Sequence, residues 1–244
     1  MRRKTSMSYI TIMSFNIHHG RGTDGVLNLQ RIADLIAACD VDLAVLNEVD
    51  RNFSSRSDYI DQIDWLAHYL QMDYAFGPAV HRGENREFGN AVLSRYPIAD
   101  IQNYRLHYRL VEDRALLDVT CLIDAQPIKL YATHLSLDRI THRRQTSFIL
   151  NKVKETRLPV MLAGDWNMKP GSSPWCNVTR HLIDSWQEAG EGAGCTYPSY
   201  RPRARLDYIF LSPAFRVVQA DVVKTLPEAS DHLPLVIKVY THFQ

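Results

Sequence analysis

The stretch VDLAVLNEV, residues 41–49, is apolar over most of its length and then ends in an amide and a carboxylate. A short apolar run bounded by polar residues is typical of a strand that is buried on both faces. The chain repeats this pattern in LPVMLAGDWN (158–167), LDYIFLS (206–212) and LPLVIKVY (233–240). Because such strands have no side suited to solvent, they predict sheets that are covered on both faces.

Other segments supply the remaining elements. Apolar residues at helical spacing predict helices over 27–39 and 59–70, a long helix over 139–155, and a short helix or turn over 181–189. The expected buried side of the long helix consists of Ile140, Phe148, Ile149 and Val153. Runs rich in β-branched and aromatic residues predict strands at 9–15, 90–95, 98–106, 114–124, 128–135 and 215–223.

These elements, about ten strands with three or four helices, predict an α+β fold in which two sheets pack face to face and helices cover their outer sides. The sequence contains no internal repeat, low-complexity tract or linker, so we expect a single domain over residues 9–244. Residues 1–8 are expected to form a short disordered leader, because their basic start lacks the apolar core and cleavage site of a signal peptide.

Charge and cysteine content limit the classes of partner. A formal net charge of +1 gives no bulk electrostatic support for nucleic-acid binding, but it is compatible with a small phosphorylated substrate. No apolar run reaches the roughly 18 residues of a transmembrane helix, so stable membrane insertion is not expected. The chain has four widely spaced cysteines and no CxxC pair, which favours a reducing, cytoplasmic location over a disulfide framework or a structural zinc site.

Reactive side chains gather where the expected strands begin or end. They are Asn16, Glu48, His134, Asp165, Asn167, Asp207, Asp231 and His232. Turn formation explains Asp165 and Asn167, and by itself it would also explain the Asp231–His232 pair. It does not explain Glu48 or His134, which have no advantage in turns. If these strand ends share one edge, they build a polar site on rigid supports.

At this point the sequence resembles a known family. The motifs NIHHG (16–20), LNEVD (46–50), GNAVLSRYPI (89–98), THL (133–135), GDWN (164–167), LDYI (206–209) and SDHLPL (230–235) occur in the order typical of the endonuclease/exonuclease/phosphatase superfamily, which includes pancreatic-type DNases and exonuclease III-like enzymes. The resemblance implies a four-layer αββα sandwich of two mainly antiparallel sheets. It also implies hydrolysis of phosphate esters with a divalent cation, usually Mg²⁺, with Mn²⁺ as an alternative.

The resemblance also implies roles for the residues at the strand ends. Glu48 is expected to be the principal metal ligand, supported by Asn16 and Asp231, because Mg²⁺ prefers hard oxygen ligands. Asp165 would orient and deprotonate the attacking water with help from Asn167. His134 and His232 would donate hydrogen bonds to the phosphoryl oxygens, and Asp207 would hold the tautomer of His232. The family usually has glutamine before the metal-binding glutamate, whereas this chain has Asn47.

Weaker candidates for substrate binding are His18, Asn90 and Arg205. His18 could face the substrate, and His19 is expected to be a solvated neighbour. Asn90 either contacts the phosphate or forms a turn before a strand. Arg205 alternates with Arg201 and Arg203, so the three either bind a second phosphate together or belong to a solvated loop.

Three functions follow from this sequence. The first is a metal-dependent hydrolase (phosphodiesterase, nuclease or phosphatase) acting on a small or single-stranded phosphate ester. A second is a lipid phosphodiesterase, for which Trp175 and the loop at residues 81–89 offer slight support. A third is a non-catalytic binding module on the same fold. A nuclease for long duplexes would need many phosphate-tracking Lys and Arg side chains, which the balanced charge does not suggest.

Overall fold

The computed structural model describes residues 9–241, so the expected leader at residues 1–8 lies outside the described residues. Within that range the chain forms two six-stranded sheets. The first has the order β11 (Phe215–Val222), β12 (Leu235–Thr241), β1 (Tyr9–Asn16), β2 (Leu43–Arg51), β4 (Glu87–Ser94), β3 (Asp73–His81). The second has the order β5 (Ile98–Leu106), β6 (Arg114–Ile123), β7 (Gln126–His134), β8 (Val160–Asp165), β10 (Asp207–Leu211), β9 (Ile183–Asp184).

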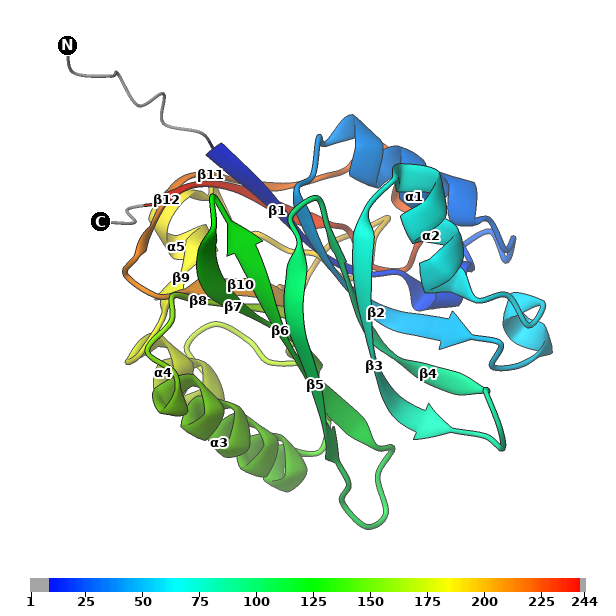
Figure 1. Ribbon diagram of the computed structural model, residues 1–244, viewed down its shortest axis with the longest axis horizontal. Coiled ribbons are helices and arrows are strands. Elements are labelled where there is room, and N and C mark those ends of the chain that lie inside the picture. The colour runs from blue at the N-terminus through cyan, green and yellow to red at the C-terminus, as the bar shows by residue number, and fades with distance from the viewer. Residues whose placement is uncertain (1–8, 242–244) are drawn as a thin grey trace.

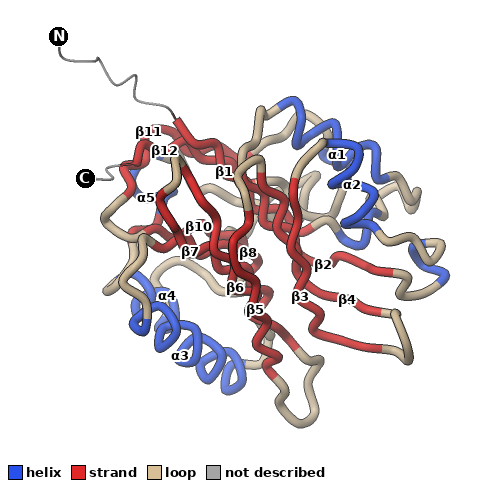
Figure 2. The backbone as a smooth tube through the Cα atoms, in the orientation of Figure 1, coloured by secondary structure: helices blue, strands red, loops and turns tan. Residues whose placement is uncertain are grey.

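The two sheets pack face to face, and helices cover their outer sides (Figure 1). Helices α1 (Leu29–Ala38) and α2 (Gln62–Leu70) lie against the first sheet, and α3 (Arg139–Glu155) and α4 (Ser173–Thr179) lie beside the second. A short helix, α5 (Ser185–Ala189), follows β9. Figure 2 shows the resulting helix–sheet–sheet–helix order, which confirms the expected four-layer sandwich.

Alternation along the strands explains why both faces of each sheet are buried. In β1, Ile10 and Ile12 enter the cluster between the two sheets, whereas Met13 and Phe15 enter the cluster beneath α1 and α2. Successive side chains of a strand point to opposite faces, so an uninterrupted apolar run supplies two hydrophobic layers at once. A third cluster fills the space between the second sheet and α3.

Each sheet contains one central parallel pair among antiparallel neighbours. β1 runs parallel to β2 and β7 runs parallel to β8, whereas every other named neighbour in the described sheets is antiparallel. Asn16 is in register with Asn47, and His134 is in register with Asp165. The mainly antiparallel prediction is therefore confirmed, and the parallel pairs align the polar strand ends.

Some local predictions were wrong. β3 was missed because Gly77 and Pro78 interrupt its apolar pattern. Helix α4 was not predicted, and strand β9 lies inside the stretch 181–189 that was predicted as a short helix or turn. Ile140 is 66% exposed and does not belong to the buried side of α3. The buried side of α3 is instead largely polar, because His142 donates from Nε2 to the carbonyl of Trp166 at 2.6 Å and Gln145 Oε1 accepts from the Ser136 N–H at 2.9 Å.

Two further predictions concern membrane-spanning helices and the state of the cysteines. Among the described residues, no helix combines the length and apolar character needed to cross a membrane. Cys39, Cys121, Cys176 and Cys195 are free thiols in this structure.

Candidate active site

Glu48 projects from a β-bulge. Leu46 of β2 pairs with Ala91 of β4 and Val49 pairs with Gly89. Asn47 and Glu48 therefore both lie opposite Asn90, so β2 has one extra residue here. Glu48 has a φ of 58°, a left-handed value that is uncommon for a residue with a Cβ. Bulges next to active sites commonly redirect a side chain out of the regular alternation. The bulge therefore explains how a strand buried on both faces presents a half-buried carboxylate at its end.

Asn16 links the carboxylates of the two sheets. Its Nδ2 donates to Glu48 Oε1 at 3.0 Å and to Asp165 Oδ2 at 3.1 Å, while its Oδ1 accepts from the N–H of His18 at 3.1 Å. The three bonds together fix the orientation of the amide, since flipping it would lose all of them. Asn16 thus lies between the expected metal ligand and the expected base, with its oxygen turned toward the backbone of His18.

Asn47 connects the sheets one layer deeper. This fully buried amide accepts from the Asp165 N–H at 2.8 Å and donates to the Thr133 carbonyl at 3.0 Å and to Asn90 Oδ1 at 2.8 Å. It therefore holds the ends of β7 and β8 against β2. The shorter amide found in place of the family's usual glutamine uses both of its N–H groups and its oxygen here.

Asp165, His232 and Asp207 form a buried row. His232 Nδ1 lies 2.8 Å from Asp207 Oδ2, and its Nε2 lies 3.7 Å from Asp165 Oδ2. Burial alone would lower the pKa of His232, but the Asp207 carboxylate and then Asp165 outweigh it and raise that pKa to about 10. Burial and the charge of Asp207 raise the pKa of Asp165 to about 7. The row thus holds a protonated imidazole beside a carboxyl group that titrates near neutral pH.

His134 and Asn167 form a second pair beside this row. Asn167 Nδ2 donates to the Leu135 carbonyl at 3.0 Å, which fixes the amide orientation, and it lies 3.2 Å from His134 Nε2. Burial and then the positive charge of Arg114 hold the pKa of His134 well below its usual value. The neutral ring therefore accepts from Asn167 at Nε2 and carries its proton on Nδ1. Asp165 Oδ1 accepts from the Asn167 N–H at 3.0 Å, so the turn after β8 also exists.

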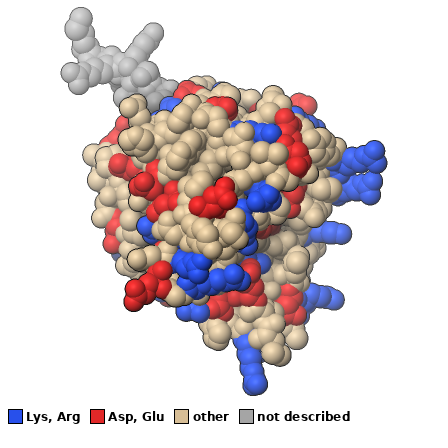
Figure 3. Space-filling model, turned by 90° about the vertical axis from the view of Figure 1, so that its right-hand side faces the viewer, with Lys and Arg blue, Asp and Glu red and all other residues tan. Residues whose placement is uncertain are grey.

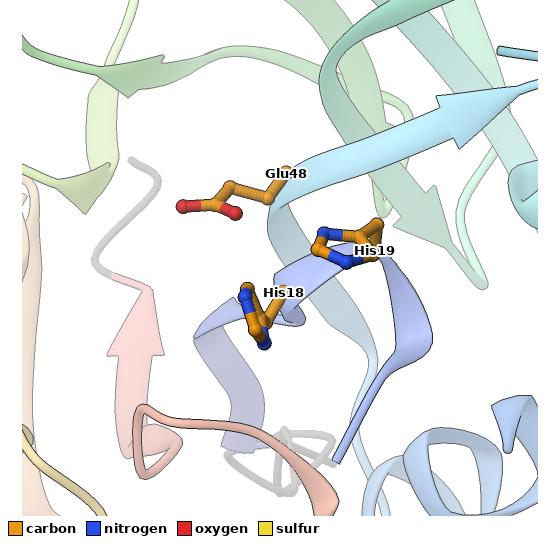
Figure 4. Close-up of side chains that lie close together, drawn as sticks. All are labelled: His18, His19 and Glu48. Atoms are coloured by element: carbon orange, nitrogen blue, oxygen red, sulfur yellow. The ribbon is translucent and has the colours of Figure 1, made fainter. Parts of the chain in front are cut away.

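His18 and His19 lie beside Glu48, on the loop that follows β1 (Figure 4). One ligand atom from each of the three side chains falls within 4.8 Å of the others. The expectation that His19 is a solvated neighbour is wrong, because its side chain is only 9% exposed. Burial, and then the charges of His18 and Arg56, lower the pKa of His19 to about 4.

Two of the predicted residues occupy other surroundings. Asp231 is half-buried, and its carboxylate oxygen lies 3.4 Å from the Ser230 hydroxyl, which also donates to the Asn16 carbonyl at 2.7 Å. Asn90 lies inside β4 and not in a turn before it. Its Nδ2 donates to the Ala115 carbonyl at 3.0 Å, so the side chain joins the two sheets and has only one amide N–H left for a phosphate.

The prediction for Arg205 needs correction. Its side chain is 4% exposed and donates from both terminal nitrogens to Asp184, at 3.2 and 2.9 Å. Arg201 and Arg203 are exposed, so the three arginines do not share a face. A buried guanidinium that is already paired with a carboxylate is a structural ion pair, so Arg205 is withdrawn as a substrate-binding candidate.

Sequence reasoning missed Arg114 and Tyr197. Arg114 begins β6, and together with Asn90 and His134 it lines a cavity of about 10 Å³, the size of one water. The Tyr197 ring packs on the ring of His232, with a centroid separation of 4.8 Å. Nothing in the local sequence marks either residue, because each reaches the site only through tertiary packing.

A cavity of about 600 Å³ opens beside Asn167. Among its lining residues are three basic side chains, Arg139, Arg143 and Lys169, together with the exposed side chain of Leu137. Of the predicted site residues only Asn167 lines this space, which is large enough for a small molecule.

Known proteins resemble this chain in sequence and in fold. Residues 13–232 match the model of the endonuclease/exonuclease/phosphatase family. The chain is 25% identical to the uncharacterized protein YbhP of Escherichia coli strain K12, over 98% of this chain and 100% of that protein. An endonuclease/exonuclease/phosphatase from Beutenbergia cavernae has a TM-score of 0.83 at 27% identity, covering 96% of this chain and 72% of the other. A mannosyl-6-phosphatase from Bacteroides thetaiotaomicron has a TM-score of 0.78 at 18% identity, covering 94% and 99%.

Proposed function

The chain belongs to the endonuclease/exonuclease/phosphatase family, and from its site we propose that it hydrolyses phosphate esters with the help of a divalent cation, Mg²⁺ or Mn²⁺. The observation that carries the proposal is the amide of Asn16, which lies between Glu48 at 3.0 Å and Asp165 at 3.1 Å. A carboxylate suited to a cation and a carboxylate suited to a water molecule thus flank one side chain.

The residues around the proposed cation match what it requires. Glu48 supplies a half-buried carboxylate oxygen, and the neighbouring buried His19 has an Nδ1 without a partner among the described residues. Glu48 and Asp231 would hold the cation or its waters, and Asn16, which donates to Glu48 Oε1, would orient that carboxylate. A bound divalent cation would neutralise charge that develops on the phosphoryl oxygens.

The other side chains would divide the proton transfers and the charge stabilisation. Asp165 has a pKa of about 7, so near neutral pH it can take the proton of an attacking water that Asn167 helps to position. His232, kept protonated by Asp207, would donate from Nε2 to a phosphoryl oxygen, and neutral His134 would donate from its ring N–H. Water would attack phosphorus in line with the leaving oxygen.

The charge distribution favours a small or single-stranded ester over a long duplex. On the face shown in Figure 3, the described basic and acidic side chains are interspersed and form no broad basic field. A protein that tracks duplex phosphates needs several such contacts in a row. The cavity beside Asn167, with Arg139, Arg143 and Lys169 at its wall, would hold the rest of a small anionic substrate.

A lipid head-group phosphodiester is a second candidate. Leu137 is 78% exposed at the wall of the cavity, and Ile140 is exposed on the same segment of chain. Two apolar side chains beside the site would suit contact with a lipid surface. Trp175 no longer supports this candidate, since its indole N–H is bound to Asp184 at 2.8 Å.

The test is turnover of nucleotide, sugar-phosphate and phospholipid esters in the presence of Mg²⁺ or Mn²⁺. Glu48→Gln and Asp165→Asn should each abolish hydrolysis while leaving the unfolding transition in place. Asp118→Asn is the matched control, because Asp118 is a buried carboxylate paired with Lys129 at 2.7 Å in the middle of β6. Activity within a few-fold of wild type in Glu48→Gln would contradict the proposal. Absence of any Mg²⁺ or Mn²⁺ binding would favour the non-catalytic module.

A further inference from the structure

The loop after β1 places two imidazoles against the carboxylate that the family motif assigns to a cation. His18, His19 and Glu48 surround a common space (Figure 4), and one ligand atom from each lies within 4.8 Å of the others. We propose that these three side chains form a mixed nitrogen–oxygen site that selects a first-row transition-metal dication, such as Mn²⁺, Co²⁺ or Zn²⁺, over Mg²⁺. The inference rests on the proposed metal dependence and concerns which cation the site prefers.

The hydrogen bond of His18 prepares its ring for a metal. His18 Nδ1 lies 3.0 Å from the carbonyl of Arg21. A carbonyl accepts only, so Nδ1 carries the proton and Nε2 keeps its lone pair. Histidines that bind metals commonly donate their other ring N–H to a carbonyl or carboxylate in this way. His18 therefore has the tautomer of a ligand, with a lone pair on Nε2 for a cation.

His19 has an unmet bonding requirement. Its side chain is buried, and its Nδ1 has no hydrogen-bond partner among residues 9–241. Buried polar atoms without a partner are rare, and an unseen ion is one of the recognised explanations. Gln62 Nε2 donates to the His19 carbonyl at 2.7 Å, which fixes the backbone of the loop at this residue.

The backbone holds all three residues in an unusual conformation. His18, His19 and Glu48 have φ values of 45°, 45° and 58°, each in the left-handed region although none is glycine. Such conformations persist only where the surrounding structure enforces them, and they concentrate at ligand sites. The loop is enforced here from both ends, since the Ile17 N–H donates to the Asn47 carbonyl at 3.0 Å and the Gly20 N–H donates to the Ile17 carbonyl at 2.8 Å.

Neighbouring positive charges do not block a cation. Arg56 donates to the buried carboxylate of Asp50 at 2.9 and 2.6 Å, so its charge is already paired. Arg21 donates to the carbonyls of Gly25 and Arg56. Glu48 then supplies the negative charge that faces the two imidazoles.

The donor set determines which cation is preferred. Mg²⁺ binds oxygen ligands in a strict octahedral arrangement and keeps several waters. Imidazole nitrogens suit the first-row transition metals, and two histidines with one carboxylate is a recurring ligand set for them. An oxygen-only site at Glu48 would leave both imidazoles unused.

The test titrates metal-free wild-type protein with Co²⁺, followed by visible absorption, and with Mg²⁺, followed by calorimetry. His18→Asn keeps a donor for the Arg21 carbonyl but deletes Nε2. His19→Phe keeps a ring of similar size, and the Nδ1 that it removes has no protein partner. His68→Asn, at an exposed position on α2, is the control. Urea unfolding of each metal-free variant checks that it folds, and the half-exposed position 18 carries the test if His19→Phe does not.

We expect wild type to bind Co²⁺ at least about 100-fold more tightly than Mg²⁺, and His18→Asn and His19→Phe each to lose at least about tenfold in Co²⁺ affinity. Their Mg²⁺ affinity should change by less than about threefold, and His68→Asn should change neither affinity. Wild-type Co²⁺ affinity in both variants, or equal losses for the two cations, would overturn the inference. Hydrolysis supported by Mg²⁺ and lost in Glu48→Gln would then still uphold the proposed function.

Discussion

Replacing Asn47 by leucine tests whether one buried amide holds together the strand ends at the candidate site. The two side chains have similar volumes, so the main change is the loss of the bonds to Asp165, Thr133 and Asn90. A buried donor or acceptor that loses its partner costs about 1–3 kcal/mol. The Asp165 N–H and Asn90 Oδ1 both lose theirs, so the free energy of unfolding should fall by about 2–6 kcal/mol.

Urea unfolding measures this loss directly, with an m-value unchanged from wild type. For a chain of this size each kcal/mol corresponds to roughly 2–4 °C in melting temperature, so thermal unfolding gives a second reading. Asn103→Leu is the matched control. Asn103 also bridges the two sheets, donating to the Pro78 carbonyl at 2.9 Å, but it is exposed, so water replaces the lost bond. If Asn47→Leu costs no more than Asn103→Leu, the reasoning is refuted.

Three other predictions concern pH, close packing and a buried ion pair. Because the pKa of His232 is raised to about 10, its contribution to stability is complete below about pH 6.5 and is lost as pH rises toward 10. Urea titrations in EDTA at stepped pH should show the free energy of unfolding falling by up to about 1.4 kcal/mol per pH unit for this one group. The Asp207→Asn variant should flatten that decline. Gly164→Ala should prevent folding, judged by circular dichroism, because the new Cβ would lie 1.8 Å from a β7 carbonyl oxygen at a φ of +141°. Arg205→Met should cost about 3–5 kcal/mol in unfolding free energy by stranding Asp184, and the kcat of the folded enzyme should stay unchanged.

The layered fold was predictable because the signals for it are local. An apolar run at residues 41–49 or 158–165 reports burial on both faces without reference to any partner, and helical spacing at 27–39 reports α1. Polar residues at the ends of such runs could be recognised for the same reason. The resemblance to the family then predicted that these strand ends belong to one site.

The features that could not be predicted depend on contacts between residues that are far apart in the sequence. Arg205 reads as one of three alternating arginines until Asp184, 21 residues earlier, is seen to neutralise it. The buried side of α3 is polar because its side chains satisfy backbone groups of loops that lie elsewhere in the sequence. The bulge at Glu48 also has no local signature, because its cause is the register with β4.

His19 shows how a local assumption can fail. A histidine that follows a motif residue in a glycine-containing loop suggests a solvated side chain. The backbone at residues 18 and 19 is instead left-handed, and the ring of His19 is buried. The sequence gives no sign of this backbone conformation. The same conformation places both rings beside Glu48.

The first sheet takes β1 to β4 from the start of the chain and β11 and β12 from its end, with the whole second sheet between them in sequence. During synthesis on the ribosome, β1 therefore emerges more than 200 residues before its partner β12. The hydrogen bond between Ser230 and Asn16 spans a sequence separation of this size. Until β12 is present, that edge of β1 has no strand partner, and unpaired strand edges favour aggregation. The same late segment carries His232, so the row of Asp165, Asp207 and His232 cannot form before that segment is present.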